Sequence, residues 1–445
     1  MNGSNQFILL IGASIGVLIG MKNNISFKSM INDVSLNLKS ITGAILILLM
    51  VGSLSGTWLI SGIIPSMIYY GLQILNPIIF LPSCLLICAI VSVSTGSSWT
   101  TSATVGIALI GIGKALGIPA GMVAGAVISG AYFGDKLSPL SDTTNLSPAV
   151  SGTDIFTHIR YLTITTVPTI TVTIIILSIL NFSIDINGST ENEYMLLAIK
   201  NTFYISPLLF LVPLFVILMI FKKTPPLIAL FVGTILGALF ALFFQIDTLN
   251  QISESDGKNV NDIYKIILNS ITNETNIESE NPILNELFSS GGMKGMLNTI
   301  WLVICAMVFG GIMEAIGALQ RISAFLLNLS QSTFSVFAST VSSCLAINLT
   351  ASDQYLSIVI PGKMFSQAYK DKGLAPENLS RTLEDAGTVT SVLIPWNTCG
   401  AYQSGILGVG VFDYFIYAIF NWLSPFTTLL VAAINFKIKG LELTK

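Results

Sequence analysis

The chain has 445 residues, of which 52% are hydrophobic and only 10% are charged, with a net charge of −3. A soluble domain carries about a quarter charged residues, so this composition excludes an ordinary soluble protein and indicates one built for lipid. His158 is the single histidine, which excludes a histidine-rich metal site and a histidine-based catalytic triad. No cofactor and no nucleic-acid partner is expected.

The first apolar run, residues 6–21, has no positive charge before it and is followed by Lys22. That order predicts a retained helix rather than a cleaved signal peptide. The five cysteines lie in apolar segments without paired spacing. They predict neither a disulfide framework nor a zinc site.

Several later runs reach the roughly 20 apolar residues that cross a bilayer core. They cover residues 161–182, 203–221, 226–245 and 297–319. The predicted fold is therefore all-α: a multi-pass protein of the cytoplasmic membrane with about 9 to 11 transmembrane helices, some of them broken or re-entrant.

Lysine and arginine mark cytoplasmic loops, which places residues 22–40, 158–160, 221–224 and the C-terminal tail inside. The acidic, polar segments 183–193 and 247–296 are placed outside. The latter divides the chain into two halves. The expected organisation is an N-terminal helix and cytoplasmic loop (1–40), a first repeat (41–160), linking helices (161–246), a polar extracytoplasmic loop (247–296), a second repeat (297–410), and a final helix with cytoplasmic tail (411–445).

The two halves resemble each other when one is shifted by 256 residues. The shift places Ser97 on Asp353, Trp99 on Tyr355 and Asp142 on Thr398. By the charge argument the first copy starts inside and the second starts outside. The halves are thus predicted to be inverted repeats, an architecture of secondary transporters that hold substrate near the bilayer midplane.

Four polar segments interrupt the apolar pattern. Non-helical backbone survives at membrane depth only where it lines a cavity or is buried in protein. Intramembrane carboxylates cost roughly 2.5–3.5 kcal/mol on insertion scales and indicate function, and oxygen groups suit a hard cation. The interruptions span residues 92–104, 134–147, 348–357 and 384–400. Asp135, Asp142 and Asp353 are the carboxylates of the middle two.

A structural alternative places these groups at helix ends in the headgroup region. Asp135 and Lys136 could neutralise each other there, and Glu384 and Asp385 follow Arg381 closely enough for an ordinary ion pair. Glu314, alone in an apolar run, needs a partner such as Arg321 or Lys136.

The chain resembles the NhaC family of sodium/proton antiporters within the ion transporter superfamily. One branch of that family exchanges malate and protons against lactate and sodium. The resemblance implies electrochemically driven exchange of Na⁺ for H⁺, with malate-H⁺/Na⁺-lactate exchange as the alternative. It rests on residues 51–65, 94–106, 125–160, 350–365 and 379–402.

Physically, an exchanger needs carboxylates that hold either Na⁺ or a proton. Burial raises the pKa of a carboxyl group and a nearby cation lowers it, so competition in a dry cavity couples the two fluxes. The expected Na⁺ ligands are Asp142, Asp353, Asp135, Ser97, Ser141, Thr143, Thr144 and Asn397. The expected proton-coupling groups are Asp142, Asp353, Asp135, Glu384, Asp385 and Glu314.

For an organic anion, Lys136 or Arg381 would supply the counter-charge. The expected partners are Na⁺, H⁺ and the lipid bilayer, with malate and lactate in the alternative; a homodimer is allowed. An ion channel is a distant alternative, because nothing resembles a ring-forming filter. An intramembrane aspartyl protease is another, because "AYFGD" (131–135) approaches its motif but no partner motif is present. No enzyme activity is expected.

Overall fold

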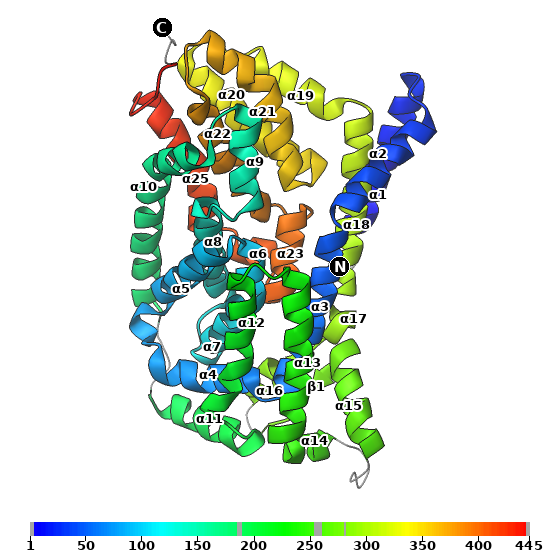
Figure 1. Cartoon of the computed structure of the whole chain (residues 1–445), viewed down its shortest axis with the longest axis vertical. Coiled ribbons are helices and arrows are strands. Elements are labelled where there is room, and N and C mark those ends of the chain that lie inside the picture. The colour runs from blue at the N-terminus through cyan, green and yellow to red at the C-terminus, as the bar shows by residue number, and fades with distance from the viewer. Residues whose placement is uncertain (1–3, 185–188, 253–259, 280–281, 442–445) are drawn as a thin grey trace.

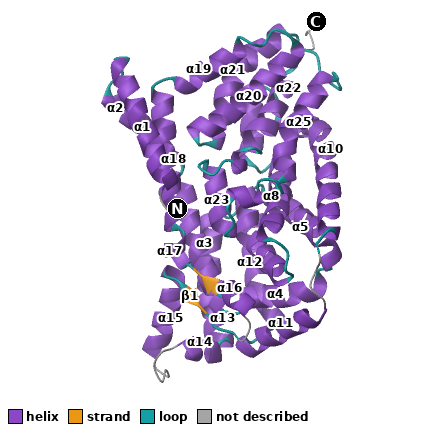
Figure 2. Ribbon diagram, turned by 180° about the vertical axis from the view of Figure 1, so that it is seen from behind, coloured by secondary structure: helices purple, strands orange, loops and turns teal. Residues whose placement is uncertain are grey.

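The computed structural model describes residues 4–184, 189–252, 260–279 and 282–441. These residues form an almost entirely helical protein (Figures 1 and 2). Strand structure within the described ranges is confined to β1 (Thr275–Asn276), which pairs antiparallel with β2 (Ser289–Ser290).

Seven described helices are long and apolar enough to cross a membrane. The bent pair of α11 (Ser189–Thr202) with α12 (Leu211–Phe221) adds an eighth if it is one span, with an 81° bend near η3 (Pro207–Phe210). The prediction of a polytopic all-α membrane protein is confirmed. The seven are α1 (Ser4–Lys22), α3 (Thr42–Ile60), α5 (Phe80–Thr95) with η1 (Pro77–Ile79), α10 (Ile155–Phe182), α13 (Pro226–Phe244), α18 (Leu297–Ala315) and α20 (Thr333–Ala351). Shorter apolar helices are α4 (Ile63–Ile74), α19 (Ala318–Leu327) and α25 (Ile419–Ala433).

Helix boundaries differ from the apolar runs for local reasons. The run predicted from residue 161 begins six residues earlier, because the Asp154 side chain accepts hydrogen bonds from the Phe156 and Thr157 amides and caps α10. The run predicted to reach residue 319 ends at Ala315, because Gly317 takes a left-handed φ of 69° and opens α19.

The segment expected to be a polar loop, residues 247–296, contains regular structure in its described parts. It folds into short helices around the β1–β2 pair, which lies towards the lower end of Figure 2. Its hydrophobic positions are spaced to give an amphipathic helix, a pattern that overall polarity obscures. The helices are α14 (Ile246–Ile252), α15 (Val260–Thr272), α16 (Pro282–Leu287) and α17 (Gly292–Gly295).

Two helical hairpins enter the molecule from opposite ends (Figure 1). The first is α5 followed by α6 (Ser98–Thr101), η2 (Ser102–Gly106) and α7 (Ile107–Ala115), and the second is α20 followed by α21 (Gln354–Asp371). Gly96 turns the first tip with a φ of 70°, and Ser352 turns the second with a φ of 59°. Each turn residue precedes an N-cap, which is Ser97 in one hairpin and Asp353 in the other.

Two broken helices accompany the hairpins. One runs through α8 (Ala120–Leu137), a short link with a turn at residues 139–140, and α9 (Asp142–Ser151). The other runs through α22 (Pro376–Leu383), the π-helical η4 (Glu384–Thr388), η5 (Ser391–Leu393) and α23 (Thr398–Leu407), before α24 (Val411–Tyr414). Ser141 caps α9 and Asn397 caps α23. These caps, like those of the hairpins, are 256 residues apart, the same offset on which the predicted repeats were aligned.

Small residues let α8 lie directly against α5. A Cβ added to Gly130 would sit 2.1 Å from the Leu85 carbonyl oxygen, well inside van der Waals contact. This close approach carries the end of α8 to the first hairpin tip. The remaining long element, α2 (Phe27–Ser40), packs with α1 against α18.

Candidate functional site

Both hairpin tips open on one cavity of about 550 Å³. The first tip contributes residues 95–100 and the second contributes 353–355. The start of α9 lines a third side, and the beginning of α3 with the α12–α13 turn lines a fourth. Segments of both predicted repeats therefore line the same cavity.

Six of the eight predicted Na⁺ ligands line this cavity. They are Asp135, Asp142, Asp353, Ser97, Ser141 and Thr143. The other two are buried behind it: Thr144 donates its hydroxyl to the carbonyls of Asp135 and Lys136 at 3.1 and 3.2 Å, and Asn397 donates to the Asn348 side chain. Thr144 and Asn397 therefore shape the wall rather than face the cavity.

Asp135 holds the first hairpin tip in place. Its Oδ2 accepts hydrogen bonds from the Ser98 amide at 3.1 Å and from the Ser98 hydroxyl at 2.7 Å. Asp135 is 8% exposed. The carboxylate therefore faces the cavity while both bonds fix its direction.

Asp353 and Asp142 differ in how they are held. Asp353 caps α21, with Oδ1 accepting from the Leu356 amide at 2.9 Å. Asp353 therefore lies at a helix end, as the structural alternative expected, and it also lies on the cavity wall. Asp142 is exposed at the first position of α9. The cavity is therefore not closed on the side of Asp142 in this conformation, whereas Asp135 and Asp353 are buried.

The three aspartates occupy separate points on the wall. Tyr355 lines the same cavity as Asp142, Asp353 and Asp135. Among the described residues, however, no three His, Cys, Asp or Glu side chains converge as a metal site. A cation here would need hydroxyl, carbonyl or water oxygens in addition to one or two carboxylates, as hard cations accept.

Glu384 lies behind the cavity wall, fully buried in η4. Its Oε1 accepts from the Thr143 hydroxyl at 3.1 Å, and its Oε2 accepts from the Ser147 hydroxyl at 2.5 Å. The Ser141 and Thr143 hydroxyls are 3.1 Å apart and both line the cavity. Hydroxyl groups therefore connect the cavity surface to this glutamate.

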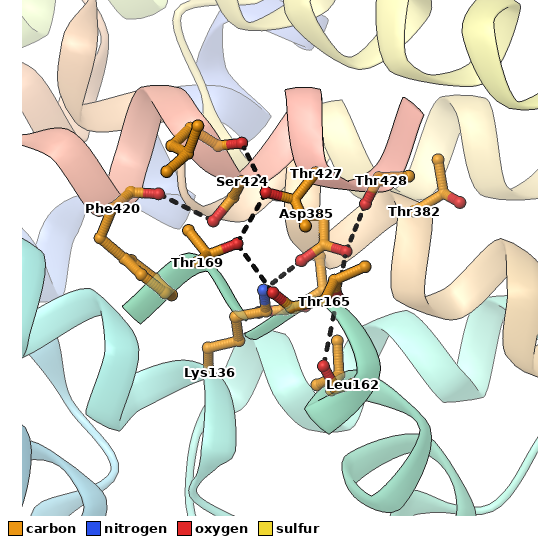
Figure 3. A network of polar contacts seen from close by, with 12 residues as sticks. Lys136, Leu162, Thr165, Thr169, Thr382, Asp385, Phe420, Ser424, Thr427 and Thr428 are labelled. Carbon is orange, nitrogen blue, oxygen red and sulfur yellow. Dashed lines mark hydrogen bonds and ion pairs between the residues drawn. The ribbon is translucent and has the colours of Figure 1, made fainter. Parts of the chain in front are cut away.

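Asp385 pairs with Lys136, and neither side chain is exposed. The Asp385 Oδ2 also accepts from the hydroxyls of Thr165 at 2.7 Å and Thr428 at 2.5 Å. In Figure 3 these three donors converge on the one carboxylate. The Lys136 ammonium lies 5.4 Å from the Phe420 ring centroid. This pairing excludes the weighed Asp135–Lys136 and Asp385–Arg381 pairs, since each partner points elsewhere.

Arg381 and Glu314 lie away from the cavity wall. Arg381 is fully buried, and its guanidinium stacks 4.6 Å from the Tyr161 ring centroid. Within the described ranges none of its nitrogens has a hydrogen-bond partner. Glu314 is half-buried at the end of α18, and it forms no ion pair with Arg321 or Lys136. Neither predicted anion contact, Lys136 nor Arg381, reaches the cavity.

Lys223 is a cavity residue that the sequence did not single out. It lies in the α12–α13 turn with a left-handed φ of 62°. The two prolines that follow it, Pro225 and Pro226, are the sequence signal for that turn, but nothing in them indicates a neighbour in another helix. Lys223 is the positive side chain among the residues lining this cavity.

A family model described as the Na⁺/H⁺ antiporter family matches residues 130–436. The Na(+)/H(+) antiporter NhaC of Alkalihalophilus pseudofirmus is 39% identical over 95% of this chain and 87% of its own length. The malate-2H(+)/Na(+)-lactate antiporter of Bacillus subtilis is 35% identical over 94% of the chain and 86% of its length. The arginine/ornithine antiporter ArcD of Halobacterium salinarum is 34% identical over 89% and 79%.

Proposed function

Because the chain belongs to the Na⁺/H⁺ antiporter family, we propose that it exchanges Na⁺ for H⁺ across the cytoplasmic membrane. The family consists of transporters, which argues against the protease alternative. The observation that carries the proposal is that Asp135, Asp142 and Asp353, from both predicted repeats, line one cavity at the hairpin tips.

Sodium would bind to carboxylate oxygens of this cavity, helped by hydroxyls of Ser97 and Ser141 and by water. One water occupies about 30 Å³ of liquid, so a cavity of about 550 Å³ leaves a bound Na⁺ part of its hydration shell. A proton on the same carboxylate removes the charge that attracts Na⁺. Na⁺ and H⁺ then exclude each other from the site, and this competition alone is enough to couple their fluxes.

A second candidate is exchange of an organic acid together with these ions. Lys223 supports it, since a cation in the cavity wall could pair with a carboxylate of the cargo. A relative named for malate and lactate supports it as well. The volume of the cavity accommodates either cargo.

The deciding experiment uses purified protein in liposomes with a pH gradient. Addition of Na⁺ alone should move protons; if malate or lactate is required as well, the organic acid candidate replaces the first. Asp142→Asn should abolish proton movement without unfolding, because the Asp142 side chain makes no hydrogen bond within the described chain. Asp371→Asn, an exposed change at the far end of α21, is the matched control. Wild-type transport by the Asp142 variant would remove that residue from the site.

A further inference from the structure

We propose that the Lys136–Asp385 ion pair is a fixed brace that positions the cavity carboxylates and neither carries protons nor contacts cargo. The proposal rests on the exchange function above for its transport readout, but its stability readout does not. Lys136 and Asp385 are accordingly positioning residues, in place of the anion-contact and proton-coupling roles expected of them.

The brace joins four elements at one carboxylate. Lys136 ends α8, Asp385 lies in η4, Thr165 belongs to α10 and Thr428 belongs to α25. All of these side chains are buried, and Figure 3 shows their contacts with the Asp385 carboxylate. Because every partner of Asp385 is a donor, the group satisfies them best as a carboxylate, whose two oxygens only accept.

The residue before each member of the pair contacts a segment that lines the cavity. Asp135, next to Lys136, accepts both hydrogen bonds from Ser98 at the first hairpin tip. Glu384, next to Asp385, accepts from Thr143 and Ser147 on α9. A shift of either backbone would therefore move the first hairpin tip or the start of α9.

A separate contact crosses the gap in the first broken helix, next to the brace. Thr144 on α9 donates to the carbonyls of Asp135 and Lys136 at the end of α8. The α8 end, the α9 start and η4 are thereby tied together. The brace itself is separated from the cavity, since neither Lys136 nor Asp385 lines it.

A buried charge without its partner is strongly destabilising, whereas replacing both partners by well-packed hydrophobic residues of similar volume is often neutral. We therefore expect Lys136→Met and Asp385→Asn, made singly, to lower the thermal midpoint and to slow Na⁺/H⁺ exchange about tenfold or more. The double variant K136M/D385N removes both charges and keeps an amide oxygen for the threonine hydroxyls. It should regain most of the thermal midpoint lost in the single variants, less the cost of the unpaired asparagine amide, and exchange within about threefold of wild type.

The pH dependence of exchange distinguishes a positioning role of the ion pair from a role in carrying protons. The double variant should keep the wild-type profile, since its cavity carboxylates are unchanged. Thr169→Val is the matched control, because the Thr169 hydroxyl bridges α10 to Thr427 on α25 at 2.9 Å without touching the ion pair. A double variant that stays unstable, that is stable but inactive, or that shifts the pH profile overturns the proposal. If wild-type protein moves no protons with Na⁺, the exchange function fails while the thermal midpoints still test the brace.

Discussion

Replacing Asp353 with asparagine should separate its charge from its role as a helix cap. Asparagine caps helices about as well as aspartate, so the hydrogen bond from the Leu356 amide is retained and the free energy of unfolding should change by about 0.5 kcal/mol or less. Asp353→Ala removes the cap as well and should destabilise the protein by about 1 kcal/mol.

The loss of charge should appear in Na⁺ binding. Asp353 is 7% exposed, and for two unit charges about 4 Å apart near a protein surface the attraction is about 4 kcal/mol. That corresponds to a roughly thousandfold weaker apparent affinity for Na⁺. The assay is the Na⁺ dependence of proton release from liposomes, with thermal melting in parallel and Asp371→Asn as control. An Asp353→Asn variant with wild-type Na⁺ dependence would refute the placement of this carboxylate at the ion site.

Three further substitutions test other parts of the site. Gly96→Ala should lower both the thermal midpoint and exchange, because its added Cβ would lie 2.6 Å from the Leu140 Cβ in the link before α9, in addition to the strain of a positive φ. Gly152→Ala, also at positive φ but with open space, carries the backbone strain alone, so it should melt above Gly96→Ala and leave exchange unchanged. Lys223→Gln removes a positive charge that repels Na⁺ from the cavity, a repulsion of about 1 kcal/mol in water, so the Na⁺ concentration for half-maximal exchange should fall several-fold. Lys222→Gln should leave that concentration unchanged, and equal effects of the two substitutions would contradict the placement of Lys223 in the cavity wall. Thr143→Val should slow exchange by leaving the buried glutamate one donor short, and Thr143→Ser should restore it; failure of the serine rescue would count against the hydroxyl link.

The hairpin tips and broken helices were predictable because membrane chemistry forces them to be polar. A helix that breaks within the bilayer exposes amides and carbonyls, which small and hydroxylated residues satisfy. The stretches around Ser97, Asp142 and Asp353 therefore stand out from apolar sequence. The offset of 256 residues between the two halves also pairs the N-caps that the structure shows, Ser97 with Asp353 and Ser141 with Asn397.

The partners of the buried charges could not be predicted in the same way. Lys136 follows Asp135, and Asp385 follows Arg381 by four residues, so nearness in sequence suggested those local pairs. Tertiary packing instead joins Lys136 to Asp385 across 249 residues. Lys223 likewise reaches the cavity only because the α12–α13 turn packs beside the hairpin tips, and the exposure of Asp142 depends on how the two halves are placed.

The competition at the cavity carboxylates is tested most directly by Na⁺ binding to the purified protein in weakly buffered solution, followed by calorimetry and by the protons released. The account predicts that Na⁺ binding releases protons, that the apparent Na⁺ affinity falls as the pH is lowered, and that the double variant Asp142→Asn with Asp353→Asn does neither. Sodium binding that is independent of pH and releases no protons, or binding that the double variant leaves unchanged, would contradict it.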